Sequence, residues 1–189
     1  MKARKYLTLD TETATLPFAD QIARNSKEKQ DIAIARPLVY DIGWVIHDSK
    51  KRIYAKRSFL VTEIFSVPAV FNTAYYKEKR PLYLARLRSG DITLKTWAEI
   101  TELLFQDLQG IDFCTAANAQ FDYKKAIPFT EQYIYHLYSD DYQAWEDKQR
   151  MVCLDIINKV KYNPQNRNYD AANFTFKGID FPIIDTWGV

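Results

Sequence analysis

The sequence predicts an α/β fold in which a mixed sheet is flanked by helices. Residues 6–12 alternate apolar and polar side chains, which is typical of a half-buried strand. Residues 38–48 form a longer, strongly apolar strand, and an amphipathic helix over residues 93–110 separates it from a short apolar strand over residues 111–118. Strands that are separated by helices along the chain favour a mixed sheet with helices on its faces.

The remaining elements follow from the same periodicities and from turn residues. Residues 47–51 have hairpin-turn chemistry, so a strand over residues 50–62 should pair with the preceding strand in an antiparallel meander. Thr96 and Glu99 resemble a capping box, and Gly110 suits the end of that helix. The other expected segments are a loop with a short helix (16–37), short helices and loops (63–92), a helix start (119–127), helices with a break at residues 139–141 (129–161), a loop (163–173) and an apolar strand (181–187).

Composition and charge indicate one globular domain over residues 1–189. Hydrophobic residues make up 47% of the chain and charged residues 26%, which is far from the composition of a disordered protein. The net charge of +2 neither demands nor excludes nucleic acid, so a binding surface would have to be local. The 13 Tyr, 11 Phe and 4 Trp residues should mostly be core, although a few could stack on bases.

The two cysteines and the N-terminus favour a cytoplasmic protein. Cys114 and Cys153 each lie in an apolar run, which indicates buried thiols in a reducing compartment rather than a zinc site. Acidic residues appear by Asp10, before any apolar stretch of a signal peptide, and no run approaches the length of a membrane span. We therefore expect no membrane partner.

Two carboxylates one residue apart mark the first strand as a candidate site. Asp10 and Glu12 project from the same strand face, roughly 7 Å apart. Such a pair is repulsive unless it is solvated or bridged by cations. Taken alone, it is more often a solvated strand end than half of a metal site.

A second candidate element begins where the strand over residues 111–118 ends. Asn118 is followed by a helix with Asp122 in its first turn. These could be an N-cap and a complement to the helix dipole, although Phe121 occupies the capping-box position. If this strand is the neighbour of the first one, Asp10, Glu12 and Asp122 converge at one edge of the sheet. Three oxygen ligands there would suit Mg²⁺ or Mn²⁺, and two such ions can act together on a phosphodiester.

Three segments in this order resemble the DEDD (DnaQ-like) superfamily of 3′–5′ exonucleases. They are LDTETATLP (residues 9–17), VYDIGWV (39–45) and AANAQFD (116–122), and the resemblance covers residues 4–127. It implies a ribonuclease H-like fold and two Mg²⁺ or Mn²⁺ ions that Asp10, Glu12 and Asp122 bind. It also places Thr11 and Thr13 near the terminal nucleotide, and it makes Asn118 a substrate-binding residue that orients the strand–helix turn.

The activity implied by this resemblance is hydrolysis of the terminal phosphodiester of a single strand, which releases a nucleoside monophosphate. DNA is favoured over RNA as substrate, and a DNA polymerase is a candidate partner. Two alternatives stay open at this point. One is a non-catalytic nucleic-acid-binding or interaction module of the same fold, and the other is a relative that cuts endonucleolytically.

The family's third motif is the part of the pattern that the sequence does not supply. It consists of His or Tyr followed by Asp on a helix after a strand that often reads like IIDTW, and here the sequence stops at Val189. We therefore expect a domain that is incomplete at its C-terminus. His136 precedes Asp141 by the family's spacing, but it comes too early in the chain, and a surface histidine beside an acidic helix break is the favoured interpretation.

Overall fold

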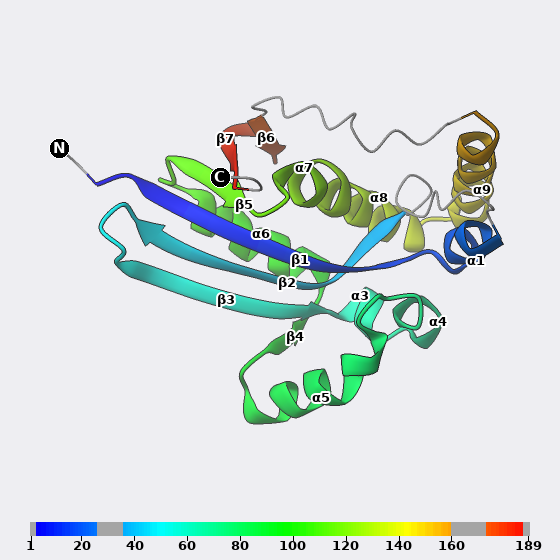
Figure 1. Ribbon diagram of the computed structural model, residues 1–189, viewed down its shortest axis with the longest axis horizontal. Coiled ribbons are helices and arrows are strands. Elements are labelled where there is room, and N and C mark those ends of the chain that lie inside the picture. The colour runs from blue at the N-terminus through cyan, green and yellow to red at the C-terminus, as the bar shows by residue number, and fades with distance from the viewer. Residues whose placement is uncertain (1–2, 26–35, 160–172, 187–189) are drawn as a thin grey trace.

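Seven strands form one mixed sheet in the computed structural model, which describes residues 3–25, 36–159 and 173–186 (Figure 1). The strand order is β4-β3-β2-β1-β5-β7-β6, so β1 lies in the middle of the sheet. The strands are β1 (Lys5–Thr15), β2 (Pro37–Asp48), β3 (Ile53–Val61), β4 (Thr93–Lys95), β5 (Phe113–Ala116), β6 (Asn173–Phe176) and β7 (Ile179–Asp185). The predicted α/β class with a mixed, helix-flanked sheet is confirmed.

The helices alternate with the strands along the chain. They are α1 (Pro17–Asn25), α3 (Thr62–Phe65), α4 (Pro68–Phe71), η1 (Lys77–Lys79), α5 (Arg80–Ser89), α6 (Trp97–Leu108), α7 (Ala119–Phe121), η2 (Asp122–Ala126), α8 (Ile127–Leu137) and α9 (Tyr142–Lys159). The break predicted at residues 139–141 separates α8 from α9. Within the part of the chain that the structure describes, no helix is long and apolar enough to cross a membrane.

Strand β1 is antiparallel to β2 on one side and parallel to β5 on the other. The pairing with β5 joins residues that are far apart in the sequence, because Tyr6 lies opposite Phe113 and the Lys5 amide donates to Asp112 Oδ2 over 2.7 Å. Strand β7 pairs in parallel with the other edge of β5, where Asp185 lies opposite Ala116. The first strand and the strand expected over residues 111–118 are therefore neighbours, which is the condition for the convergence of the carboxylates.

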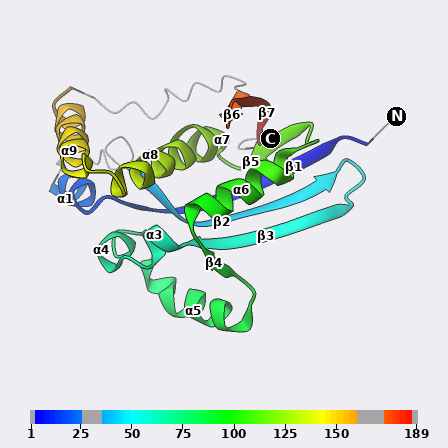
Figure 2. The same cartoon turned by 180° about the vertical axis from the view of Figure 1, so that it is seen from behind.

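The two faces of the central strands have different surroundings. Leu7 and Leu9 are buried on one face, where Trp44 donates its indole N–H to Asp107 of α6 over 2.9 Å. Helix α6 passes behind the strands in Figure 1 and in front of them in the reverse view of Figure 2, so it covers this face. The opposite face carries Thr8, Asp10 and Glu12, because side chains alternate along a strand.

The predicted hairpin between β2 and β3 is present. Asp48 is buried at its turn and accepts hydrogen bonds from the backbone amides of Lys50 and Arg52 over 2.8 and 3.1 Å. Its other oxygen accepts from the Arg52 guanidinium and the Tyr54 hydroxyl, over 2.8 and 2.9 Å. Desolvation of Asp48 acts to raise its pKa, but these hydrogen bonds outweigh it and hold the pKa well below its usual range.

Two short strands were not expected, and some predicted segments fall partly on residues that the structure does not describe. Residues 93–95 form β4 beside β3, so the helix predicted from residue 93 begins instead at Trp97, directly after its capping box. Strand β6 pairs with β7 just after the predicted loop. The parts of predicted loops over residues 26–35 and 163–172 lie outside the described residues. Both cysteines are buried, as expected, and neither forms a disulfide bond with a described residue.

Candidate active site

The two carboxylates of the first strand lie inside β1 rather than at its end. Strand β1 continues to Thr15 and stays paired with β2, with an irregularity between Glu12 and Thr13. The expectation of a strand end at Glu12 is therefore wrong. On the other side, however, the pairing with β5 stops at Thr8, so Asp10 and Glu12 lie beyond the end of that neighbour.

Asp122 lies against β1, as the predicted convergence requires. Its side chain is only 3% exposed, and its Oδ1 accepts a hydrogen bond of 2.5 Å from the hydroxyl of Thr11. Thr11 stands between Asp10 and Glu12 in the sequence, so this bond ties the third carboxylate directly to the strand that carries the first two. Thr11, which the resemblance placed near substrate, thus has a defined contact within the protein.

The backbone between β5 and Asp122 differs from the expected helix start. The Asn118 carbonyl accepts from the amides of Phe121 and Asp122 over 2.8 and 3.1 Å, and its side chain makes no capping hydrogen bond. Asp122 then opens a five-residue π-helical turn, η2, in place of an exposed first turn of an α-helix. Such turns widen a helix locally and are frequent at functional sites.

The pKa values of Asp10, Glu12 and Asp122 are all raised in the folded protein. Burial raises the pKa of Asp122 to about 7; the Thr11 hydrogen bond opposes this, and the charges of Asp10 and Asp185 add to it. The pKa of Asp10 is also raised by burial. Burial and the charges of Asp10 and Asp41 raise the pKa of Glu12, against the lowering effect of Lys79.

Asp41 and Asp185 join the cluster, although neither was predicted to be a ligand. Asp41 lies opposite Glu12 in the β1–β2 register, and burial raises its pKa to about 6 against the opposing effects of Tyr83 and Arg86. Asp185 ends β7 beside the end of β5, where its charge raises the pKa of Asp122. The predicted antiparallel meander was the signal for Asp41, because it makes residue 41 a neighbour of the first strand.

A groove of about 510 Å³ runs over the exposed face of β1 and β2 beside these acids. Asp10, Glu12 and Asp41 line it from the sheet, and we call it the acidic groove. Cations and a hydroxyl line it from the other side, where η1 and α5 contribute Lys79, Arg86 and Tyr83. An anion that carries a divalent cation would therefore meet carboxylates on one wall and positive side chains on the other.

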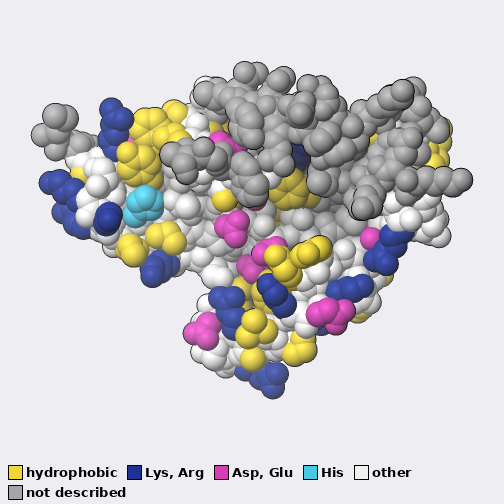
Figure 3. Space-filling model, viewed as in Figure 1, with side chains coloured by type: hydrophobic (Ala, Val, Ile, Leu, Met, Phe, Trp, Pro, Cys, Tyr) yellow, Lys and Arg dark blue, Asp and Glu magenta, His cyan; other side chains and the backbone are white. Residues whose placement is uncertain are grey.

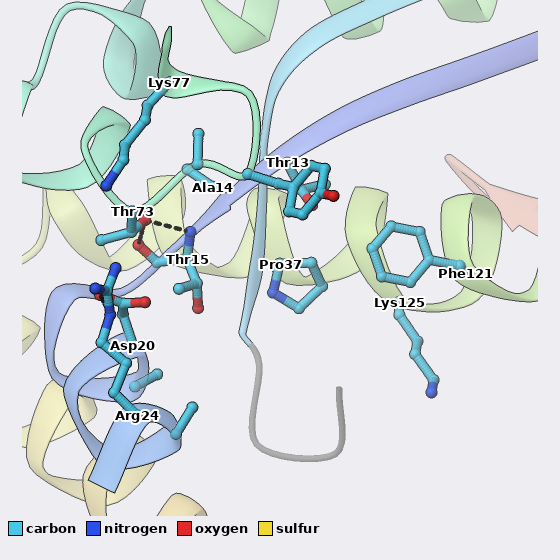
Figure 4. A pocket seen from close by; sticks show the side chains of 14 residues that line it. Thr13, Ala14, Thr15, Asp20, Arg24, Pro37, Thr73, Lys77, Phe121 and Lys125 are labelled. Carbon is cyan, nitrogen blue, oxygen red and sulfur yellow. Dashed lines mark hydrogen bonds and ion pairs between the residues drawn. The ribbon is translucent and has the colours of Figure 1, made fainter. Parts of the chain in front are cut away.

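A second cavity of about 510 Å³, the end pocket, opens where β1 leaves the acidic groove (Figure 4). Thr13 and Phe121 line it, and these residues follow Glu12 and precede Asp122 in the sequence. Its other walls come from α1, from the start of β2 and from the segment around residues 73–77. Most of the lining is apolar, while Lys77 and Lys125 add positive charge without an ion pair to any described residue. Thr13 and Phe121 thus join the end pocket to the carboxylate cluster.

The donor chemistry of the cluster fits divalent cations, but its carboxylates are not gathered around one point. Among the described residues, no three His, Cys, Asp or Glu side chains are placed to hold a single metal ion. Mg²⁺ is commonly held by one or two carboxylates together with waters and substrate phosphates, so a full cage of protein ligands is not required. Asp10 and Glu12 line the acidic groove and Asp122 lies near Asp10, so the cluster offers the one or two carboxylates that such an ion takes from a protein.

The two histidines lie away from these carboxylates. His136 Nδ1 lies 2.9 Å from Asp141 Oδ1 at the end of α8, and its ring stacks on Trp145. It is fourteen positions after Asp122 along η2 and α8, which is roughly 20 Å along a helix axis. His47 is the second-last residue of β2 and pairs with Ile53 of β3, so it belongs to the predicted hairpin, and its Nε2 is 2.9 Å from the Thr8 hydroxyl.

Comparison of the chain with protein-family models, with curated proteins and with solved structures finds no match.

Proposed function

We propose that the chain is a metal-dependent 3′–5′ exonuclease of ribonuclease H-like fold that acts on single-stranded nucleic acid, with DNA the favoured substrate. The observation that carries the proposal is the carboxylate cluster, in which the buried Asp122 accepts a hydrogen bond from Thr11, the residue between Asp10 and Glu12 in β1. Buried like charges with raised pKa values are costly unless cations bridge them. The central strand order β3-β2-β1-β5-β7, with β2 antiparallel to its neighbours, supports the ribonuclease H-like assignment.

The reaction would add water to the terminal phosphorus and break its bond to the 3′ oxygen of the preceding nucleotide. The products are a nucleoside 5′-monophosphate and a strand that is one nucleotide shorter, with a proton on the released 3′ oxygen. Divalent cations, when bound, supply the positive charge that stabilises the attacking and leaving oxygens. In this proposal Asp10, Glu12 and Asp122 hold those cations.

The other residues around the cluster would bind and orient the strand. Lys79 and Arg86 line the acidic groove and suit non-bridging phosphate oxygens. The end pocket, with Thr13 and Phe121 at the side of the cluster, is large enough for a terminal nucleoside. Asn118 fixes the turn that presents Phe121 and Asp122, because its carbonyl accepts from both of their amides.

A direct test uses a 5′-labelled single strand of DNA or RNA with Mn²⁺ or Mg²⁺, with and without chelator. We expect a ladder that shortens from the 3′ end and is absent in chelator. Asp10→Asn should lower the rate by about a hundredfold or more, since a lost cation ligand removes several kcal/mol of transition-state stabilisation. Asp147→Asn, on the exposed surface of α9, is the matched control. Full activity of Asp10→Asn would refute the site, and internal cuts would favour an endonuclease.

The second candidate is a non-catalytic nucleic-acid-binding module of the same fold. It is favoured by the lack, within the described residues, of three acidic or histidine ligands around one point. Strand binding without cleavage at any tested divalent cation would select it. A DNA polymerase partner stays a prediction in either case.

A further inference from the structure

A row of aromatic rings crosses three strands on the face of the sheet that carries Asp10. Tyr6 of β1 lies opposite His47 of β2 and Phe113 of β5 in the register. The ring centroids are 5.4 Å apart for Tyr6 and His47 and 5.8 Å for Tyr6 and Phe113, with planes inclined by only 17° and 21°. All three residues are partly exposed, so this stack of rings borders solvent.

The ring row is continuous with the acidic groove through Thr8. Thr8 lies between Tyr6 and Asp10 on the same face, lines the groove and approaches His47 Nε2 within 2.9 Å. Asp10 is four positions after Tyr6 along the strand, which is roughly 13 Å. This distance corresponds to about four stacked nucleotides of a single strand.

Positive and apolar side chains border the row. The Arg4 guanidinium lies over the Phe113 ring at 5.6 Å from its centroid. Lys56 of β3 lies opposite Val45 of β2, and Val45 in turn lies opposite Thr8 of β1. Neither Arg4 nor Lys56 forms an ion pair with another described residue. In Figure 3 this end of the surface carries Lys, Arg, His and hydrophobic side chains, while acidic side chains gather nearer the middle.

We infer that Tyr6, His47 and Phe113, with Arg4 and Lys56 at their border, form a stacking platform for single-stranded nucleic acid upstream of the acidic groove. The inference rests on the proposed function for its ligand class and extends it to a surface outside the cleavage site. Rings with interspersed cations suit bases and phosphates together, because every base has a face that stacks and every linkage a charge. Open sheet faces with aromatic rings bind single strands in this way.

Ring removal tests the platform without any need for cleavage. The probe is a labelled oligothymidylate of roughly twelve nucleotides, and its binding is followed by fluorescence anisotropy in chelator. We expect Tyr6→Ser to weaken binding roughly tenfold and Tyr6→Phe to preserve it, because the ring and not the hydroxyl contacts the base. Tyr135→Ser removes an exposed ring from α8 as the matched control and should leave binding unchanged. Equal binding by Tyr6→Ser and the unaltered chain would overturn the inference.

A charge variant covers the case in which Tyr6→Ser fails to fold. Lys56 is exposed, so Lys56→Glu should fold, weaken binding and reduce its salt dependence by about one released counterion. Lys148→Glu makes the same change on the exposed side of α9 and should alter neither. If Lys56→Glu and Lys148→Glu bound the oligonucleotide equally well and with the same salt dependence, the platform would be refuted.

Substrate length separates this inference from the proposed function. If the chain cleaves, Tyr6→Ser should raise the KM for the long strand while cleavage of a dinucleotide stays unchanged, since a dinucleotide is too short to reach the row. Normal cleavage with no length-dependent effect would refute the platform and leave the nuclease intact. Tyr6-dependent binding with no cleavage by any preparation would support the platform and refute the nuclease.

Discussion

Asp122 combines burial with a position among like charges, and this has a measurable consequence for stability. Its pKa rises from about 3.9 in an unfolded chain to about 7 in the folded protein. The folded state therefore binds an extra proton between these values, so stability is greatest at low pH within this window and falls as pH rises toward 7.

We expect Asp122→Asn to stabilise the cation-free protein at pH 8, by on the order of 2 kcal/mol. The amide keeps an oxygen for the Thr11 hydroxyl but carries no charge to desolvate. Urea unfolding in chelator at pH 5 and pH 8 measures this, and the variant should lose much of the difference between the two. A variant that is less stable than the unaltered chain at pH 8 would contradict the assignment, and Asp147→Asn on exposed α9 controls for net charge.

Asp48 is the opposite case, because its pKa is held below its usual range by the hydrogen bonds at the β2–β3 turn. Its contribution to stability is present above the unfolded pKa of about 3.9 and is lost as pH falls through the lower folded value. We expect Asp48→Ala to lower the urea midpoint at pH 7 and to have a smaller effect near pH 2. An equal loss at both values would show that its charge is not involved.

Individual residues also mark how far the sequence predicts the site. The convergence of Asp10 and Asp122 was predictable, because parallel neighbouring strands bring their ends to one edge of the sheet. The buried state of Asp122 was not, since it depends on the contact of this residue with Thr11 and on a π-helical turn that no sequence pattern indicates. Asp41 required the exact β1–β2 register, which an irregularity after Glu12 shifts by one residue.

At the scale of elements, side-chain periodicity predicts the helices and strands that bury an apolar face. It misses short strands that are held in the sheet mainly by backbone hydrogen bonds. Helix α6 and strands β1, β2 and β3 each have a clear apolar pattern, and all were predicted. Strand β4 has only three residues and pairs with β3 through its backbone, so no periodicity reveals it. Strand β6 is four residues long and follows a polar segment that resembles a loop.

The capping box of α6 is the prediction that belongs to this scale. The Thr96 hydroxyl accepts from the Glu99 amide over 3.3 Å, and Glu99 Oε2 accepts from the Thr96 amide over 2.9 Å. We expect Thr96→Ala to lower the free energy of unfolding by about 1 kcal/mol and Thr96→Ser to retain most of it. Chemical denaturation of the three proteins measures this, and an unchanged value for Thr96→Ala would mean that the helix start is held by other contacts.

For the molecule as a whole, cation binding should increase the stability of the folded state. A ligand that binds only the folded state raises its stability by about 2.7 kcal/mol at a hundred times its Kd. We expect Mg²⁺ or Mn²⁺ to raise the melting temperature at pH 8, and to do so less at pH 5.5, where protons compete for Asp41 and Asp122. Asp10→Asn should reduce the rise, whereas Asp147→Asn should not. A rise that is the same in every variant would point to binding elsewhere.

The central place of β1 also bears on how the chain folds as it is synthesised. Strands β2 and β3 follow β1 closely and can pair with one of its edges early, whereas β5 pairs with the other edge and is made about a hundred residues later. Until then the second edge of β1 has no strand partner, and unpaired edges are where chains associate wrongly. Pairing across so long a stretch of chain is also slow. Mutations in Phe113–Ala116 should therefore reduce the yield of native protein on refolding more than their effect on equilibrium stability would suggest.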